Sequence, residues 1–118
     1  MNGQQKFEAI RQWVRDWVEQ NRAAFAELGG AFEEREGADW DGTPFYTVDC
    51  IAPHCMARIV VSTPAFHPFR FVHMEVLDAD TECELFSWHD AHHAATRDAV
   101  QTALQRVQAL LSATNKAA

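Results

Sequence analysis

Three of the six histidines of this chain lie within five positions, in the segment FSWHDAHHAATRDAV at residues 86–100. His89, His92 and His93 have the spacing H-x-x-H-H, so on a helix His89 shares a face with the other two and these side chains could hold one metal ion. A zinc site needs a third or fourth ligand and groups that orient the ligands, and the sequence has neither an H-E-x-x-H motif nor paired C-x-x-C motifs. No serine or cysteine nucleophile stands in a recognisable turn nearby. We therefore expect neither a metal site nor a catalytic site here, and interpret the segment as a strand that ends at Trp88 and leads into a helix.

A second group of potential metal ligands lies in and near the segment CIAPHC. Cys50, His54 and Cys55 are potential ligands in a predicted turn, and Cys83 is a candidate fourth ligand. Their spacing matches none of the common zinc patterns, and unpaired cysteines are commonly buried as small hydrophobic side chains. We therefore expect purified protein to lack stoichiometric zinc and to have no hydrolytic activity. A small histidine-dependent metal-binding protein is kept as an alternative hypothesis.

Two runs of acidic residues occur in a chain whose formal net charge is already −7. The electric field of such runs can speed the association of a basic protein partner. The alternative hypothesis is that these residues are ordinary solvent-exposed turn residues without a binding role. A tryptophan lies within the first run, and tryptophan is a common anchor residue of protein interfaces. We expect these residues in turns rather than in the core. The candidate partner-binding residues are Glu33, Glu34, Glu36, Asp39, Trp40 and Asp41 in the first run and Asp78, Asp80, Glu82 and Glu84 in the second.

The composition is typical of a chain that folds around its own core. At 118 residues, 47% of them hydrophobic, one domain over residues 1–118 can bury roughly two thirds of its unfolded surface. The acidic balance argues against direct binding of nucleic acid or of an anionic membrane, both of which favour basic surfaces. We recognise no signal peptide and no membrane span, and three cysteines suit a reducing compartment. We expect a cytoplasmic protein without a cofactor.

Apolar residues at helical spacing predict one helix near each end of the chain. The first stripe runs over about residues 4–28, and the glycine pair at 29–30 then supplies the left-handed conformation in which many helices end. The second stripe lies at residues 100–111. We expect Asp90 to cap the residues that follow it and Thr96 to be a second N-cap.

Between the helices the pattern changes to strands separated by turns. Residues 31–36 favour a short strand that can fray, and Asp41-Gly42 is typical of a tight turn. Further strands are predicted at 44–52, 56–62, 69–78 and 82–88, with residues 63–68 as a loop that contains two prolines. The short turns require successive strands to be antiparallel. The predicted fold is therefore α+β, an antiparallel sheet of four or five strands with the N- and C-terminal helices packed on one face.

The strand at 69–78 is unusual because both of its faces mix polar and apolar residues. Alternation points one set to one side and the other set to the opposite side. We infer that the face without helices is partly covered by loops or by another chain. The two sets are Arg70, Val72, Met74 and Val76, and Phe71, His73, Glu75 and Leu77.

The segment VLDADTECELFSWHD resembles a stretch of the small immunity proteins of bacterial contact-dependent inhibition, in particular the TriTu immunity group. In that group a strand ends in an acidic residue, here Asp78, and turns through a hairpin that contains a threonine, here Thr81. The next strand ends in an aromatic residue and a histidine, here Phe86 and His89, and a closing helix follows from about Thr96. The N-terminal helix with its tryptophans and the chain length are also similar.

The resemblance implies a non-enzymatic protein of the bacterial cytoplasm that binds and blocks a toxin domain. In the better-known members of that group the toxin cleaves transfer RNA and works with elongation factor Tu, so the implied partners are a tRNA-cleaving nuclease domain and, in a ternary complex, elongation factor Tu. From the residues alone, two other hypotheses stay open. One is a type III-like secretion chaperone, which is also small, acidic and α+β, and the other is the metal-binding protein already described.

Overall fold

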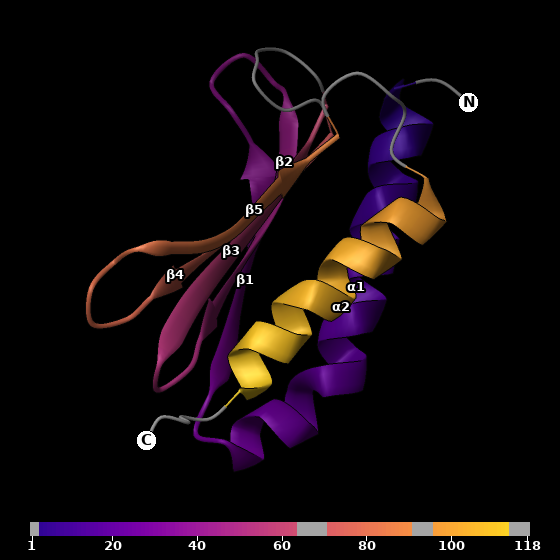
Figure 1. The fold of residues 1–118 in the computed structure, drawn as a ribbon. Coiled ribbons are helices and arrows are strands. Elements are labelled where there is room, and N and C mark those ends of the chain that lie inside the picture. The colour runs from indigo at the N-terminus through magenta and orange to yellow at the C-terminus, as the bar shows by residue number, and fades with distance from the viewer. Residues whose placement is uncertain (1–2, 64–70, 91–95, 114–118) are drawn as a thin grey trace.

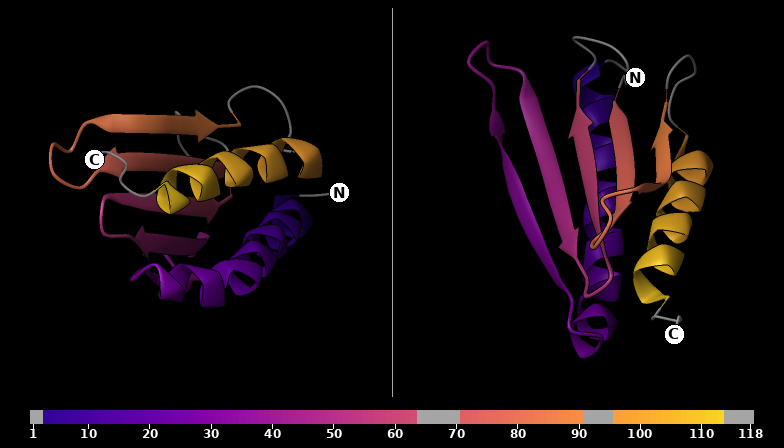
Figure 2. Two further views of the ribbon diagram at one scale, coloured as in Figure 1. Left: turned by 60° about the horizontal axis from the view of Figure 1, so that its bottom comes forward. Right: turned by 60° about the vertical axis from the view of Figure 1, so that its left-hand side comes forward.

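The computed structural model describes residues 3–63, 71–90 and 96–113, and it forms two layers, a sheet and a pair of helices (Figure 1). The order along the chain is helix, five strands, helix. Figure 1 and Figure 2 show both helices on the same side of the sheet, which confirms the predicted α+β fold. The elements are α1 (Gly3–Glu27), β1 (Ala31–Ala38), β2 (Pro44–Ile51), β3 (Cys55–Ser62), β4 (Val72–Asp78), β5 (Glu84–His89) and α2 (Arg97–Ser112).

The N-terminal helix α1 packs through the predicted apolar stripe. Its buried side chains recur in steps of three and four, which places them on one face of the helix. The helix ends as expected: Gly29 has a φ of 84°, a conformation that glycine adopts without strain, and the amide of Gly30 donates to the carbonyl of Phe25. The buried residues are Phe7, Ile10, Val14, Trp17, Val18 and Phe25.

The five strands form one antiparallel sheet in the order β1-β2-β3-β4-β5, so each strand pairs with its neighbours in the sequence. In β2, β3 and β4 buried residues alternate with less buried ones, because alternate side chains point to opposite faces. The core lies between the buried face and the helices. Its largest fully buried side chains include Tyr46, Ile59 and Met74 from the sheet and Leu104 from α2.

The second helix begins at the predicted cap. The Thr96 hydroxyl accepts a hydrogen bond of 3.1 Å from the amide of Ala99, which satisfies one of the amides that the first turn leaves without a partner. The residues that α2 buries are Val100, Ala103, Leu104, Val107 and Leu111. Neither helix is long and apolar enough to cross a membrane, as far as the described residues go.

Three details of the sequence prediction need correction. The first strand does not stop at residue 36 but pairs with β2 along its full length, from Ala31 to Ala38. Glu82 has a φ of 62° and, with Cys83, belongs to the turn before β5 rather than to the strand. The fourth strand begins at Val72 instead of 69, and residues 64–70, which contain most of the predicted loop and Arg70, lie outside the described residues.

The alternation predicted for the fourth strand is confirmed. Val72, Met74 and Val76 are fully buried against the helices, whereas His73 and Glu75 face the other side and are half-buried. Leu77 is half-buried on that same side.

Candidate functional site

The first acidic run is divided between the two faces of β1. Glu34 pairs with Val48 and Glu36 with Tyr46, which are buried positions of β2, so these two carboxylates lie on the helix side of the sheet. Glu33 pairs with Asp49 on the opposite face. The expectation that the whole run occupies turns is therefore wrong for its three glutamates, which lie in the strand that the sequence favoured at residues 31–36 and that the structure extends to Ala38.

The glutamates on the helix side are neutralised by arginines of α1. Glu34 accepts a hydrogen bond of 2.7 Å from Arg22, and Glu36 accepts one of 2.7 Å from Arg15 and one of 3.3 Å from Arg11. Such partly exposed pairs stabilise the fold by about 1 kcal/mol or less each. The carboxylates of Glu34 and Glu36 therefore hold α1 to the edge strand and are less available to a partner.

The β1–β2 turn presents the remaining residues of the first run at its tip. The Asp39 amide donates to the Thr43 carbonyl, and the Asp41 carboxylate accepts a hydrogen bond of 3.0 Å from the Thr43 amide. That backbone hydrogen bond holds the pKa of Asp41 below its usual value. Gly42, with a φ of 87°, closes the turn. Between the two aspartates, the side chain of Trp40 is 97% exposed, so an ordered turn carries a large apolar group into solvent.

The second acidic run forms the β4–β5 turn. One oxygen of Asp78 accepts hydrogen bonds from the amides of Asp80 and Thr81 and from the Thr81 hydroxyl, at 2.8 to 3.1 Å. The backbone bond from Thr81 is the main cause of the lowered pKa of Asp78. This carboxylate therefore shapes the turn, while Asp80, Glu82 and Glu84 are exposed.

The structure does not bring the two acidic runs together. In an antiparallel sheet whose strands follow sequence order, the β1–β2 turn and the β4–β5 turn lie at opposite ends, and β1 and β5 are opposite edges. Figure 1 shows the two turns well apart. A strand of eight residues is roughly 26 Å long at the usual rise per residue, so a single compact contact does not cover both.

The predicted histidine cluster is only partly described. His89 is exposed at the end of β5 and lies opposite His73 of β4, with ring centroids 6.4 Å apart. His92 and His93 lie outside the described residues. Asp90 accepts hydrogen bonds of 3.0 Å from the amides of Phe71 and Val72, so it fixes the start of β4. The residues that it was expected to cap, 91–95, lie outside the described residues.

The cysteine group is spread over two environments. Cys50 and Cys55 are buried in the core, where burial raises the pKa of both thiols, and the Cys55 thiol contacts the carbonyl of Leu110 at 3.5 Å. Cys83 and His54 are exposed in turns. Among residues 3–63, 71–90 and 96–113, no three histidine, cysteine or acidic side chains are grouped so as to hold a metal ion.

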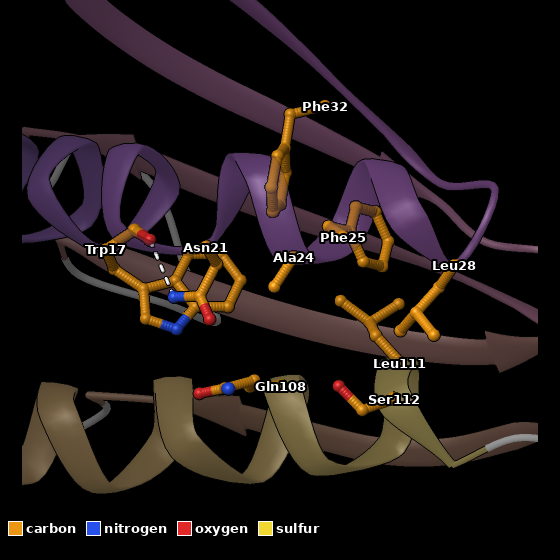
Figure 3. A pocket seen from close by; sticks show the side chains of 9 residues that line it. All are labelled: Trp17, Asn21, Ala24, Phe25, Leu28, Phe32, Gln108, Leu111 and Ser112. Atoms are coloured by element: carbon orange, nitrogen blue, oxygen red, sulfur yellow. Dashed lines mark hydrogen bonds between the residues drawn. The ribbon is translucent and has the colours of Figure 1, made fainter.

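The cavity between the two helices is too small for a metabolite. Its volume is about 30 Å³, enough for one or two water molecules. Figure 3 shows that side chains of α1 and α2 line it, with Phe32 of β1 at one side. The buried indole nitrogen of Trp17 has no hydrogen-bond partner among the described residues, so a water is the fitting occupant.

The face of the sheet that carries no helix is a second candidate surface. The sequence indicated it only through the mixture of polar and apolar residues in the strand predicted at 69–78. We call it the open face. In Figure 2 (right), α1 lies behind the strands. Ile51 and Met56 on this face are 40% and 50% exposed, although both are large apolar side chains. The open face consists of Ala31, Glu33, Arg35, Gly37, Phe45, Thr47, Asp49, Ile51, Met56, Arg58, Val60, Ser62, His73, Glu75, Leu77, Glu84, Ser87 and His89.

Comparisons of the chain with family models, with curated proteins and with solved structures give no significant match.

Proposed function

We propose that this chain is an immunity protein that binds and neutralises a toxin domain with a basic surface. The observation that carries the proposal is the exposed side chain of Trp40 between Asp39 and Asp41, at the tip of an ordered turn. A tryptophan beside carboxylates combines a large apolar contact with steering charge, and tryptophans are enriched among the residues that dominate binding energy.

The order of the turn supports this role. The Asp41 carboxylate and the two backbone hydrogen bonds of Asp39 and Gly42 fix the loop before any partner arrives. A preformed contact loses less conformational entropy on binding, so more of the interaction energy appears as affinity.

The charges around the turn support a basic partner. Asp39 and Asp41 are exposed, and neither forms an ion pair within the described part of the chain. A nuclease that cleaves transfer RNA must attract phosphate and therefore carries a basic surface. An acidic inhibitor can cover that surface, which agrees with the resemblance to TriTu immunity proteins and with elongation factor Tu as a third component.

Interactions within the chain separate the predicted contact residues into two groups. Glu34 and Glu36 are engaged by arginines of α1, and Asp78 by its own turn. Glu33 lies on the open face, five residues before β1 ends, so we assign the direct contacts to Asp39, Trp40 and Asp41. Asp80, Glu82 and Glu84 lie at the far end of the sheet and contribute to the long-range field.

The proposal is tested by co-expression with the product of the neighbouring gene. We expect the neighbouring gene to encode a large toxin whose C-terminal domain kills the host cell when it is expressed alone. Cells should survive its expression only when this chain is co-expressed, and the two proteins should co-purify. A secreted effector that binds through an unfolded segment would instead favour the secretion-chaperone hypothesis. A neighbouring product that neither binds nor is neutralised would contradict the immunity proposal.

A further inference from the structure

The open face contains a row of apolar side chains at one end. Ile51, Met56 and Leu77 are direct neighbours across β2, β3 and β4, and the first two are 40% and 50% exposed. Phe45 lies at the other end of β2, and its ring approaches Gly37 of the edge strand. A sheet face with apolar groups at both ends is costly to leave in water and is typical of a protein interface.

The charges of the open face are nearly balanced. Arg58 bonds to Asp49 at 2.7 Å and Arg35 approaches Asp49 at 3.3 Å. The hydrogen bond to Asp49, and to a smaller degree the charge of Glu75, raises the pKa of Arg58. With Glu33 and Glu84, the face holds four acids and two arginines, a sum of −2, whereas the whole chain has −7. A strongly basic partner is therefore drawn elsewhere, and a second copy can meet this face without strong repulsion.

The size of the open face suits a dimer. Five strands at about 4.8 Å spacing and about seven residues at 3.3 Å rise give a footprint of roughly 550 Å² on each copy. Two copies then bury at least about 1,100 Å² in total, which exceeds the area of roughly 1,000 Å² that a specific interface requires.

We propose that two copies of this chain pack through their open faces. A two-fold axis that lies between the two sheets and is perpendicular to the strands places each strand opposite the same strand of the other copy, in the reverse direction. The two middle rows of the face run across the strands, one through Glu33 and Asp49 and the other through Arg35 and Thr47. An axis that exchanges these rows places Glu33 over Arg35 of the other copy and Ile51 over Phe45. It also places Glu75 over His73. Such a self-complementary arrangement is what a symmetric dimer needs, and two sheets can pack in this way at about 10 Å separation.

The proposal is tested by measuring the mass of the purified chain by sedimentation equilibrium over a wide range of concentrations. The unaltered chain should have the mass of two copies. Ile51→Glu combined with Met56→Glu should yield a monomer with an unchanged circular dichroism spectrum, because both side chains are substantially exposed. Leu28→Glu is the matched control, since Leu28 is also 40% exposed but lies after α1, and it should stay dimeric.

Charge exchange gives a second and independent test. Glu33→Arg or Arg35→Glu alone should raise the dissociation constant of the dimer. The double variant should regain part of the lost affinity. A monomer at every concentration would overturn the proposal, as would a dimer that the Ile51 and Met56 changes leave intact. These outcomes are distinct from those for the immunity proposal, which concerns Trp40 and the toxin.

Discussion

The hydroxyl of Tyr46 donates a hydrogen bond of 2.6 Å to the carboxylate of Glu34, which also accepts one from Arg22. This contact joins β2 to the edge strand β1, and through the arginine it joins both to α1. Tyr46 is fully buried, and burial, followed by the hydrogen bond to Glu34 and the charge of Glu34, raises the pKa of its hydroxyl well above the usual value of about 10.

Tyr46 is the only tyrosine of the chain, so its ionisation can be followed directly by absorbance at 295 nm. We expect the folded protein to form little tyrosinate just above pH 10, where the urea-unfolded chain titrates normally. Because the folded state keeps a proton that the unfolded state loses, stability should fall as the pH rises above about 10. A native titration that coincides with the unfolded one would show that the hydroxyl is accessible.

Asp90 should be important for stability although it is remote in sequence from its partners. Its carboxylate is 6% exposed and accepts hydrogen bonds from the amides of Phe71 and Val72. Asp90→Ala leaves these amides without a partner, which should lower the free energy of unfolding by about 1–3 kcal/mol in urea denaturation. Asp80→Ala, an exposed acid at the far end of the sheet, is the control and should change it by less than about 0.5 kcal/mol. Equal effects would contradict the structural role of Asp90.

The three cysteines should differ in reactivity. A disulfide reagent such as Ellman's reagent attacks through the thiolate, and burial raises the pKa of Cys50 and Cys55, whereas Cys83 is exposed. We expect one fast-reacting thiol in the folded chain and three in denaturant. The variant Cys83→Ser should lose the fast phase, and persistence of that phase would contradict the burial of the other two.

Much of the fold was predictable because its signals are local. The stripe from Phe7 to Phe25, the glycine at 29 and the hydroxyl of Thr96 each act within a few residues, and the structure has them in those roles. The position of Asp90 was not predictable in the same way. It bonds to amides 18 and 19 residues earlier, and such a pairing requires the tertiary structure.

The residues of the candidate site could be found in the sequence, but the direction in which each side chain points could not. Whether a glutamate of β1 faces α1 or the open face depends on the register with β2, which places Glu36 opposite Tyr46 and Glu33 opposite Asp49. A shift by one residue reverses every side chain of the strand, so the sequence alone did not separate the paired acids from the exposed ones. The exposure of Trp40 follows from its place in a turn without packed neighbours.

Trp40→Ala should weaken binding of the toxin domain by about 2 kcal/mol, mainly through faster dissociation, if the side chain is an anchor of the interface. Its 97% exposure means that the fold should not change, and thermal unfolding is the control. A change in melting temperature as large as that of Asp90→Ala would contradict the placement of Trp40 in solvent, and unchanged toxin binding would remove it from the interface.

The most direct test of the account is the rate of association with the toxin domain at two salt concentrations, for two variants with the same change in net charge. The first reverses Asp39 beside Trp40, and the second reverses Asp80 at the opposite end of the sheet. Both should slow association at low salt, and the first should do so much more strongly, because screened charges act mainly within about one Debye length, roughly 10 Å at 0.1 M salt. Equal rates for the two variants, or rates equal to that of the unaltered chain, would contradict binding through the acidic β1–β2 turn.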